Sequence, residues 1–90
     1  MWAVLESRRC TKQLKKIPRE VLRQYEAWKE VVSSSGPRAL RRIPGYRDHA
    51  LKGAWKGARS SSLTNKWRVL YVVERDVAHV LVLEVNPHEY

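Results

Sequence analysis

Two apolar runs near the end of the 90-residue chain, Trp67–Val73 and Ala78–Asn86, constrain its fold more than any other feature. Both are rich in Val and Leu, and Glu74-Arg75-Asp76 marks a turn between them, which predicts an antiparallel β-hairpin with one buried face. A further strand is predicted over Ala54–Leu63, before the turn at Thr64-Asn65-Lys66. The second half of the chain is therefore expected to form an antiparallel meander.

The first half of the chain has the pattern of a strand followed by two helices. Trp2–Leu5 is a short apolar run typical of a strand, and Ser7 is placed to cap a helix over Arg8–Lys16. A second helix is expected to begin at Pro18 and to end at the Ser- and Gly-containing break before Pro37. Its apolar residues recur at near-helical spacing: Val21, Leu22, Tyr25, Trp28, Val31 and Val32. The order βαα then βββ predicts an α+β fold, with an N-terminal strand and two helices packed on a four-stranded, mainly antiparallel sheet.

Size and composition favour one small cytoplasmic domain over residues 1–90. Ninety residues leave no room for a second core. The single cysteine, Cys10, cannot form an internal disulfide, which fits a reducing compartment. No apolar run approaches the length of about 18 residues that a membrane span needs, and the first residues lack the pattern of a signal peptide. No membrane association is expected.

Positive charge is concentrated in one third of the chain. The formal net charge is +9, and the stretch from Arg38 to Arg68 contains nine basic residues against one acid, Asp48. Such segregation produces a focused positive field, which is typical of a nucleic-acid binder. RNA is the first partner to consider, although an acidic protein would be attracted by the same field.

Two arginines and two histidines are the candidates for chemistry. Arg59 and Arg68 fall on neighbouring predicted strands, and they form a two-pronged phosphate clamp if both point to the open face of the sheet. His49 and His88 can supply the base and the acid that RNA cleavage by its own 2′-hydroxyl requires. Tyr90 lies beside His88 and can stack on a base or donate a proton. Taken singly, each arginine is equally consistent with an ordinary surface residue, a lone histidine is more often an inert surface residue, and Tyr90 is also consistent with a frayed terminus.

Other residue types exclude several classes of site. Cysteine and histidine do not follow zinc-ligand spacing, and the acidic residues are too dispersed for a two-metal nuclease. No Walker-type phosphate loop is present. A mechanism without metal or cofactor is therefore expected. Trp55 and Trp67 can stack on unpaired bases, but core packing is the favoured interpretation for both.

The chain resembles the RelE/ParE superfamily of bacterial type II toxins, and within it the RelE, YoeB and YafQ branch. The motifs that carry the resemblance are Tyr46-Arg-Asp-His-Ala-Leu-Lys-Gly with Trp55-Lys-Gly-Ala-Arg, Trp67-Arg-Val-Leu-Tyr71 and the terminal Pro87-His-Glu-Tyr. The resemblance implies a RelE-like fold and an mRNA endonuclease that acts on translating ribosomes, contacts 16S and 23S rRNA at the A site, and is neutralised by a cognate antitoxin. The toxin alone is expected to be monomeric.

The resemblance also implies roles for individual residues. Arg59 and Arg68 would stabilise the phosphate, His49 would be the base, His88 an acid or base, and Tyr90 the terminal aromatic residue. Ser62 and Lys66 stand where YafQ-like chains have a histidine and an aspartate. The residues expected to bind RNA are Arg47, Lys52, Lys56, Ser62 and Lys66.

Two other functions remain open at this point. A ParE-like toxin that inhibits DNA gyrase needs the basic surface but no pair of proton-transfer groups, so His49 and His88 argue against it. An RNA-binding adaptor without catalytic activity would also account for the charge.

Overall fold

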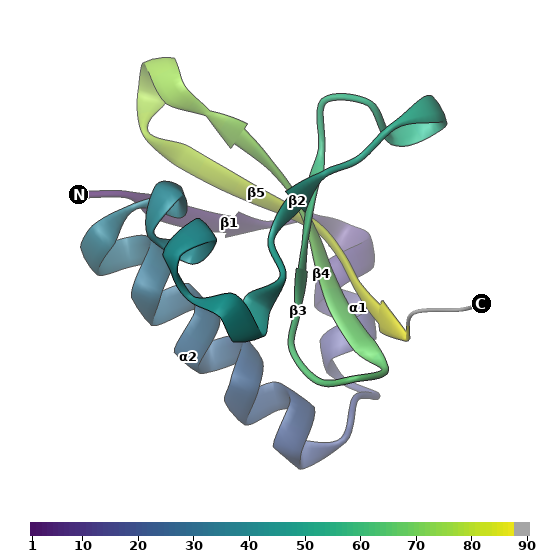
Figure 1. Ribbon diagram of the computed structural model, residues 1–90. Coiled ribbons are helices and arrows are strands. Elements are labelled where there is room, and N and C mark those ends of the chain that lie inside the picture. Colours follow the sequence, from purple (N-terminus) through teal and green to yellow (C-terminus); the bar gives the residue numbers. More distant parts are fainter. Residues whose placement is uncertain (88–90) are drawn as a thin grey trace.

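Among the residues that the structure describes, the sheet has five strands, one more than the sequence predicted (Figure 1). The computed structural model of the protein describes residues 1–87. The strands are β1 (Ala3–Glu6), β2 (His49–Ala50), β3 (Arg59–Ser62), β4 (Trp67–Glu74) and β5 (His79–Pro87). They are ordered β1-β5-β4-β3-β2, with β1 parallel to β5 and every other pair antiparallel. The predicted α+β class is confirmed, and the additional strand is the two-residue β2.

Both predicted helices are present, α1 (Arg8–Leu14) and α2 (Arg19–Ser35). In the described part of the chain they are accompanied by four short 3-10 helices: η1 (Pro37–Arg42), η2 (Pro44–Tyr46), η3 (Gly53–Trp55) and η4 (Arg75–Val77). Within residues 1–87, no helix is both long and apolar enough to cross a membrane.

The core lies between the helices and one face of the sheet, called here the helix face. The predicted apolar stripe of α2 buries Val21, Tyr25, Trp28 and Val32. The ring of Trp28 meets that of Tyr71 on β4 edge-on, with 5.2 Å between centroids, a favourable aromatic geometry. The opposite face of the sheet, called here the open face, carries the alternate residues of β3 and β4.

The predicted strand over Ala54–Leu63 is wrong in its first half. Only Arg59–Ser62 is strand, and the chain before it forms a tip on the β2–β3 hairpin, residues 52–57, that projects away from the sheet (Figure 1). Gly53 and Gly57 have φ angles of 67° and 99°, a region that glycine enters without steric cost. Trp55 lies on this hairpin tip and is 41% exposed, so the prediction that it packs in the core is also wrong.

Helix α1 covers the edge of β5 at the point where β1 ends. The Ser7 backbone N–H donates to Val82 O at 2.9 Å, and its hydroxyl donates to Leu83 O at 2.6 Å. The same hydroxyl accepts from the Cys10 N–H at 3.0 Å, which confirms Ser7 as the helix cap. Farther along α1, Gln13 Oε1 accepts from the Val85 N–H at 2.7 Å. Leu83 O and the Val85 N–H at this part of the edge are therefore satisfied by side chains, and Val82 O by the Ser7 backbone, rather than by a neighbouring strand.

Candidate active site

A hollow of about 170 Å³ lies on the open face, between β2, β3 and the β3–β4 turn. It is lined by Arg47, His49, Ser60, Ser62, Thr64, Asn65, Trp67 and Arg68. Among residues 1–87, no acidic side chain contributes to this lining. The hollow therefore combines two guanidinium groups, an imidazole and several hydroxyl groups, which suits a phosphate diester.

Strand register explains why these side chains share one face. His49 pairs with Ser60, and Ser62 pairs with Arg68. Residues directly opposite each other in antiparallel strands project to the same side of the sheet. Four of the predicted site residues are brought together in this way, since Arg47 joins His49, Ser62 and Arg68 in the lining of the hollow.

An internal anchor at Asp48 turns the neighbouring His49 outward. The Asp48 carboxylate accepts hydrogen bonds from Arg59 Nε at 2.8 Å, from Ser61 Oγ at 2.6 Å and from the Tyr71 hydroxyl. Its side chain is 0% exposed. Because successive residues of an extended chain project to opposite sides, the burial of Asp48 places His49 on the open face.

The ring of His49 is held by the backbone of Arg47. Nδ1 of His49 lies 2.8 Å from the carbonyl oxygen of Arg47. A carbonyl oxygen only accepts, so Nδ1 carries a proton, and in the neutral form of the ring Nε2 is left as the acceptor. Arg47 has a left-handed backbone, with φ 45° and ψ 40°, a conformation that is uncommon for a residue with a side chain. Nε2 is the nitrogen that a general base would use.

Arg59 and Arg68 do not form the clamp expected from the sequence. Arg59 pairs with Tyr71, which is buried on the helix face, whereas Arg68 pairs with Ser62 on the open face. Tyr71 lies three positions after Arg68 on β4, and because strand residues alternate in direction with a period of two, the two side chains project to opposite faces. Arg59 is instead bound to Asp48. Burial opposes its charge, but the hydrogen bond and negative charge of Asp48, together with Tyr71, outweigh burial and raise the pKa of Arg59.

The remaining predicted residues lie outside the hollow or outside the described chain. Lys52 and Lys56 are exposed on the hairpin tip, and Lys66 is exposed in the β3–β4 turn. His88 and Tyr90, both predicted to be catalytic, lie outside the described residues.

Several residues of the site were missed by sequence reasoning. Ser60, Thr64 and Asn65 line the hollow, and no sequence signal separates them from ordinary strand and turn residues. Asp48 could have been singled out from the sequence, because it is the single acid in a strongly basic stretch. Asn86 was also missed, although an amide in a strand rich in valine is unusual; its Oδ1 accepts from Arg68 Nε at 3.3 Å.

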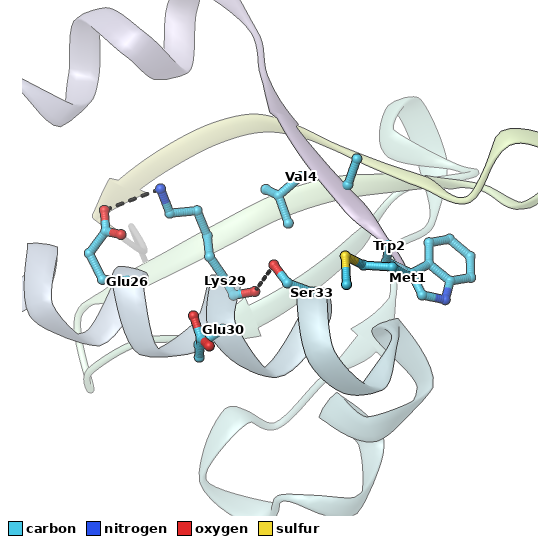
Figure 2. Close-up of a pocket in the computed structure, with 8 residues that line it drawn as sticks. Met1, Trp2, Val4, Glu26, Lys29, Glu30 and Ser33 are labelled. Carbon is cyan, nitrogen blue, oxygen red and sulfur yellow. Dashed lines mark hydrogen bonds and ion pairs between the residues drawn. The ribbon is translucent and has the colours of Figure 1, made fainter.

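A larger hollow of about 580 Å³ lies between β1 and α2 (Figure 2). Its lining includes Glu26, Lys29 and Glu30, and Lys29 is bound to Glu26 at 3.2 Å (Figure 2). Two acids and a neutralised lysine do not favour a phosphate. In the described part of the chain, no group of three or more His, Cys, Asp or Glu side chains is placed to hold a metal ion.

Solved structures that are similar to this one include a toxin and toxin–antitoxin complexes. YafQ from Escherichia coli matches with a TM-score of 0.78 and 15% identity, over 98% of this chain and 94% of that one. A YoeB–YefM complex from Staphylococcus aureus matches with a TM-score of 0.76 and 16% identity, over 99% of each chain. An archaeal RelE–RelB complex from Pyrococcus horikoshii matches with a TM-score of 0.75 and 18% identity, over 96% of this chain and 93% of that one.

The protein therefore has the RelE-like fold that its sequence motifs predicted. Its sequence matches no protein-family model and no curated protein.

Proposed function

We propose that this protein is the toxin of a type II toxin–antitoxin system and that it cleaves mRNA on the ribosome. The observation that carries the proposal is the hollow on the open face, where His49 presents an acceptor nitrogen beside Arg68. A DNA gyrase inhibitor or a simple RNA-binding adaptor would need the positive charge but not a histidine oriented in this way.

In the proposed reaction, Arg68 binds the scissile phosphate and His49 Nε2 removes the proton from the 2′-hydroxyl. The 2′-oxygen then forms a bond to phosphorus as the bond to the 5′-oxygen breaks. The products are a 2′,3′-cyclic phosphate and a 5′-hydroxyl, whose proton comes from a general acid. Arg68 stabilises the negative charge that accumulates on the phosphorane oxygens. His88 and Tyr90 are the candidates for the general acid, and the reaction uses no metal or cofactor.

The RNA is proposed to extend beyond the hollow over the surrounding basic surface. Arg47 and Ser62 contact the nucleotides at the reacting phosphate, while Lys52, Lys56 and Lys66 bind neighbouring phosphates. Arg59 acts from the other side of β3 by holding Asp48, and through it His49. Residues 1–90 are proposed to be one toxin domain, monomeric when alone, that works in the cytoplasm where ribosomes are found.

A cognate antitoxin is the proposed protein partner. The solved YoeB and RelE structures are complexes with YefM and with RelB. With a net charge of +9, this chain would attract an acidic or amphipathic segment of such a partner across the basic face or the helices.

Mapping the 5′ ends of cellular transcripts after induction tests the function directly. The parent protein is expected to inhibit growth and to produce new 5′ ends within translated frames. Arg68→Ala is expected to reduce cleavage on the order of a hundredfold or more, because one well-placed electrostatic group contributes about 3–4 kcal/mol to the transition state. His49→Ala should have a comparable effect.

The matched control is Arg75→Ala, which removes an exposed arginine from η4, at the end of β4 far from the hollow. It should cleave like the parent. Intact messages together with DNA damage would favour the gyrase inhibitor instead. Folded Arg68→Ala and His49→Ala variants that cleave as fast as the parent would disprove the site.

A further inference from the structure

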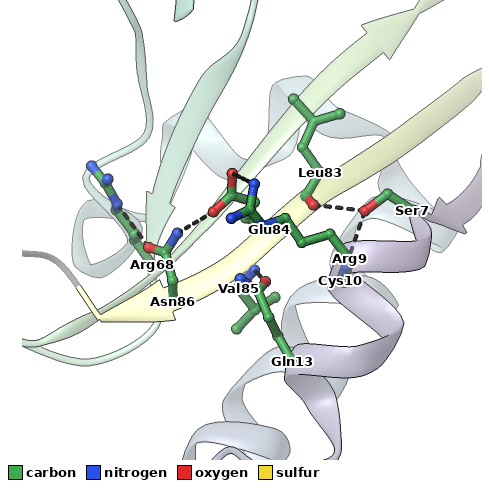
Figure 3. A network of polar contacts seen from close by, with 9 residues as sticks. All are labelled: Ser7, Arg9, Cys10, Gln13, Arg68, Leu83, Glu84, Val85 and Asn86. Atoms are coloured by element: carbon green, nitrogen blue, oxygen red, sulfur yellow. Dashed lines mark hydrogen bonds and ion pairs between the residues drawn. The ribbon is translucent and has the colours of Figure 1, made fainter.

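Arg68 is held through one edge of its guanidinium, which leaves the other end available. Its Nε donates to Asn86 Oδ1 at 3.3 Å, and the two residues are directly paired between β4 and β5 (Figure 3). A guanidinium presents five N–H groups in a planar fork. With Nε engaged, the two terminal nitrogens remain to bind two oxygens of one phosphate.

The orientation of the Asn86 amide is determined by Glu84. Asn86 Nδ2 donates to Glu84 Oε1 at 2.7 Å (Figure 3). A carboxylate only accepts, so the amide must turn its NH₂ toward Glu84 and its oxygen toward Arg68. Glu84 is 13% exposed and lies 3.8 Å from Arg9 Nη1, whose side chain is 74% exposed. That outer ion pair contributes little, because exposed pairs are weak.

A β-bulge places Glu84 and Asn86 on the open face. Val80 and Val82 of β5 are in the core, but beyond the bulge the core residue is Val85. The register changes between Leu70 and Tyr71 of β4, which pair with Glu84 and Val82 and leave Leu83 as the extra residue. Without this extra residue the even-numbered positions 84 and 86 would continue to face the core, since one inserted residue reverses the alternation.

Hydrogen bonds with Ser7, the cap of α1, and with Gln13 of α1 stabilise the bulge. The hydroxyl of Ser7 donates to Leu83 O, and Gln13 accepts from the Val85 N–H (Figure 3). Bulges are common beside functional sites because they redirect a side chain. Here the redirected side chain is the one that contacts Arg68.

Arg68 differs from Arg59 in that its partner, Asn86, is uncharged. Arg59 is bound to a carboxylate, which compensates its charge. An amide restrains Arg68 by a hydrogen bond and leaves its positive charge uncompensated at the contact. We propose that Asn86, oriented by Glu84, is a positioning residue that aims Arg68 at the scissile phosphate without cancelling its charge. This inference rests on the proposed cleavage of RNA.

A double-mutant cycle on the full-length protein tests the coupling. Single-turnover cleavage is measured on ribosomes programmed with a defined mRNA, for the parent, Asn86→Ala, Arg68→Ala and the double variant. Asn86→Ala is expected to lower the cleavage rate about tenfold with little change in KM, the effect of one hydrogen bond that orients a charged group. In the Arg68→Ala background the same change should have no further effect.

Two further variants distinguish positioning from a general structural role. Asn86→Asp should raise KM, because a carboxylate there would compensate Arg68 and repel RNA. Gln24→Ala, which shortens an exposed amide on α2, is the matched control and should behave like the parent. Thermal unfolding is measured for every variant so that only folded proteins are compared.

An NMR measurement tests the restraint independently of cleavage. The Nε–H resonance of Arg68, identified by its loss in Arg68→Lys, should exchange slowly with solvent in the parent and rapidly in Asn86→Ala. If the parent cuts no RNA, the proposed function is wrong. The exchange rate of the Nε–H resonance still decides in that case whether Asn86 holds Arg68. An unchanged resonance in Asn86→Ala, or equal loss of rate in both backgrounds of the cycle, would overturn the inference.

Discussion

At the scale of single residues, the buried carboxylate of Asp48 is the contact on which the geometry of the site depends most. It is 0% exposed and bonded to Arg59, Ser61 and Tyr71. Burial raises the pKa of Tyr71, and its bond to Asp48 adds to the effect, so the phenol remains a donor at neutral pH. Asp48 thereby joins β2, β3 and β4 at the level of the hollow.

Asp48→Ala is expected to lower the free energy of unfolding by about 3–5 kcal/mol, because Arg59 would be left partly buried without its counter-charge. Urea denaturation monitored by tryptophan fluorescence measures the loss. Asp76→Ala, which removes an exposed acid from η4, should change stability by no more than about 0.5 kcal/mol. Asp48→Asn retains acceptor capacity and is the variant to use if Asp48→Ala does not fold. A loss below about 1 kcal/mol in Asp48→Ala would contradict the anchoring role.

At the scale of elements, the β2–β3 hairpin tip is a basic segment that lies close to His49 along the chain. It begins only a few residues after His49, and a strand advances about 3.3 Å per residue. Lys52, Trp55 and Lys56 are all exposed on it. A single-stranded RNA that passes through the hollow would therefore meet both lysines.

Replacing Lys52 and Lys56 together with glutamine should weaken binding of a short unpaired RNA and make it less sensitive to salt. Each phosphate contact contributes about 0.7 to the slope of log K against log salt concentration for single strands, so the slope should fall by about 1.4. Fluorescence anisotropy over a series of salt concentrations measures it. Lys12→Gln with Lys15→Gln removes the same charge from exposed positions in α1 and at its C-cap and should leave the slope nearly unchanged. Equal slopes for both double variants would exclude a specific contact at the hairpin tip.

At the scale of the whole molecule, the core contains ionisable groups that fold in their neutral form. Burial raises the pKa of Cys10 from 9.0 to about 11. It also raises the pKa of Tyr25, where the bond to Glu6 adds to the effect. A weak acid whose pKa is higher in the folded state binds its proton more tightly there. The stabilisation that each group provides is therefore fully present at pH values below its pKa in the unfolded state. It is lost as the pH rises toward the pKa of the group in the folded state.

The free energy of unfolding should accordingly fall as the pH is raised above about 9, by about 2 kcal/mol from Cys10 alone at pH 11. Denaturation midpoints between pH 7 and pH 11 measure the decline. Cys10→Ala removes this contribution, so its stability should decline less steeply over the same range. A parallel decline in both proteins would show that Cys10 is not responsible.

Much of the fold follows from local sequence patterns. The apolar stripe of α2, the cap at Ser7 and the valine-rich hairpin of β4 and β5 each have a strong local signal. The segment before Arg59 has no such signal, because its glycines permit either a strand bulge or a tip that leaves the sheet. The prediction that Trp55 packs in the core was wrong for the same reason.

The sequence by itself determined the type and order of the elements, the concentration of positive charge, and the motifs shared with RelE-like toxins. Only the tertiary structure decided which charged side chains meet. Arg59 turned to Asp48, while Arg68 joined His49 and Asn86 on the open face. The physical reason is the two-residue period of a strand. Pairing puts Arg59 and Arg68 on opposite faces, and one extra residue at Leu83 reverses the faces of Glu84 and Asn86. Such a register is set by pairing between distant segments, which local sequence does not specify.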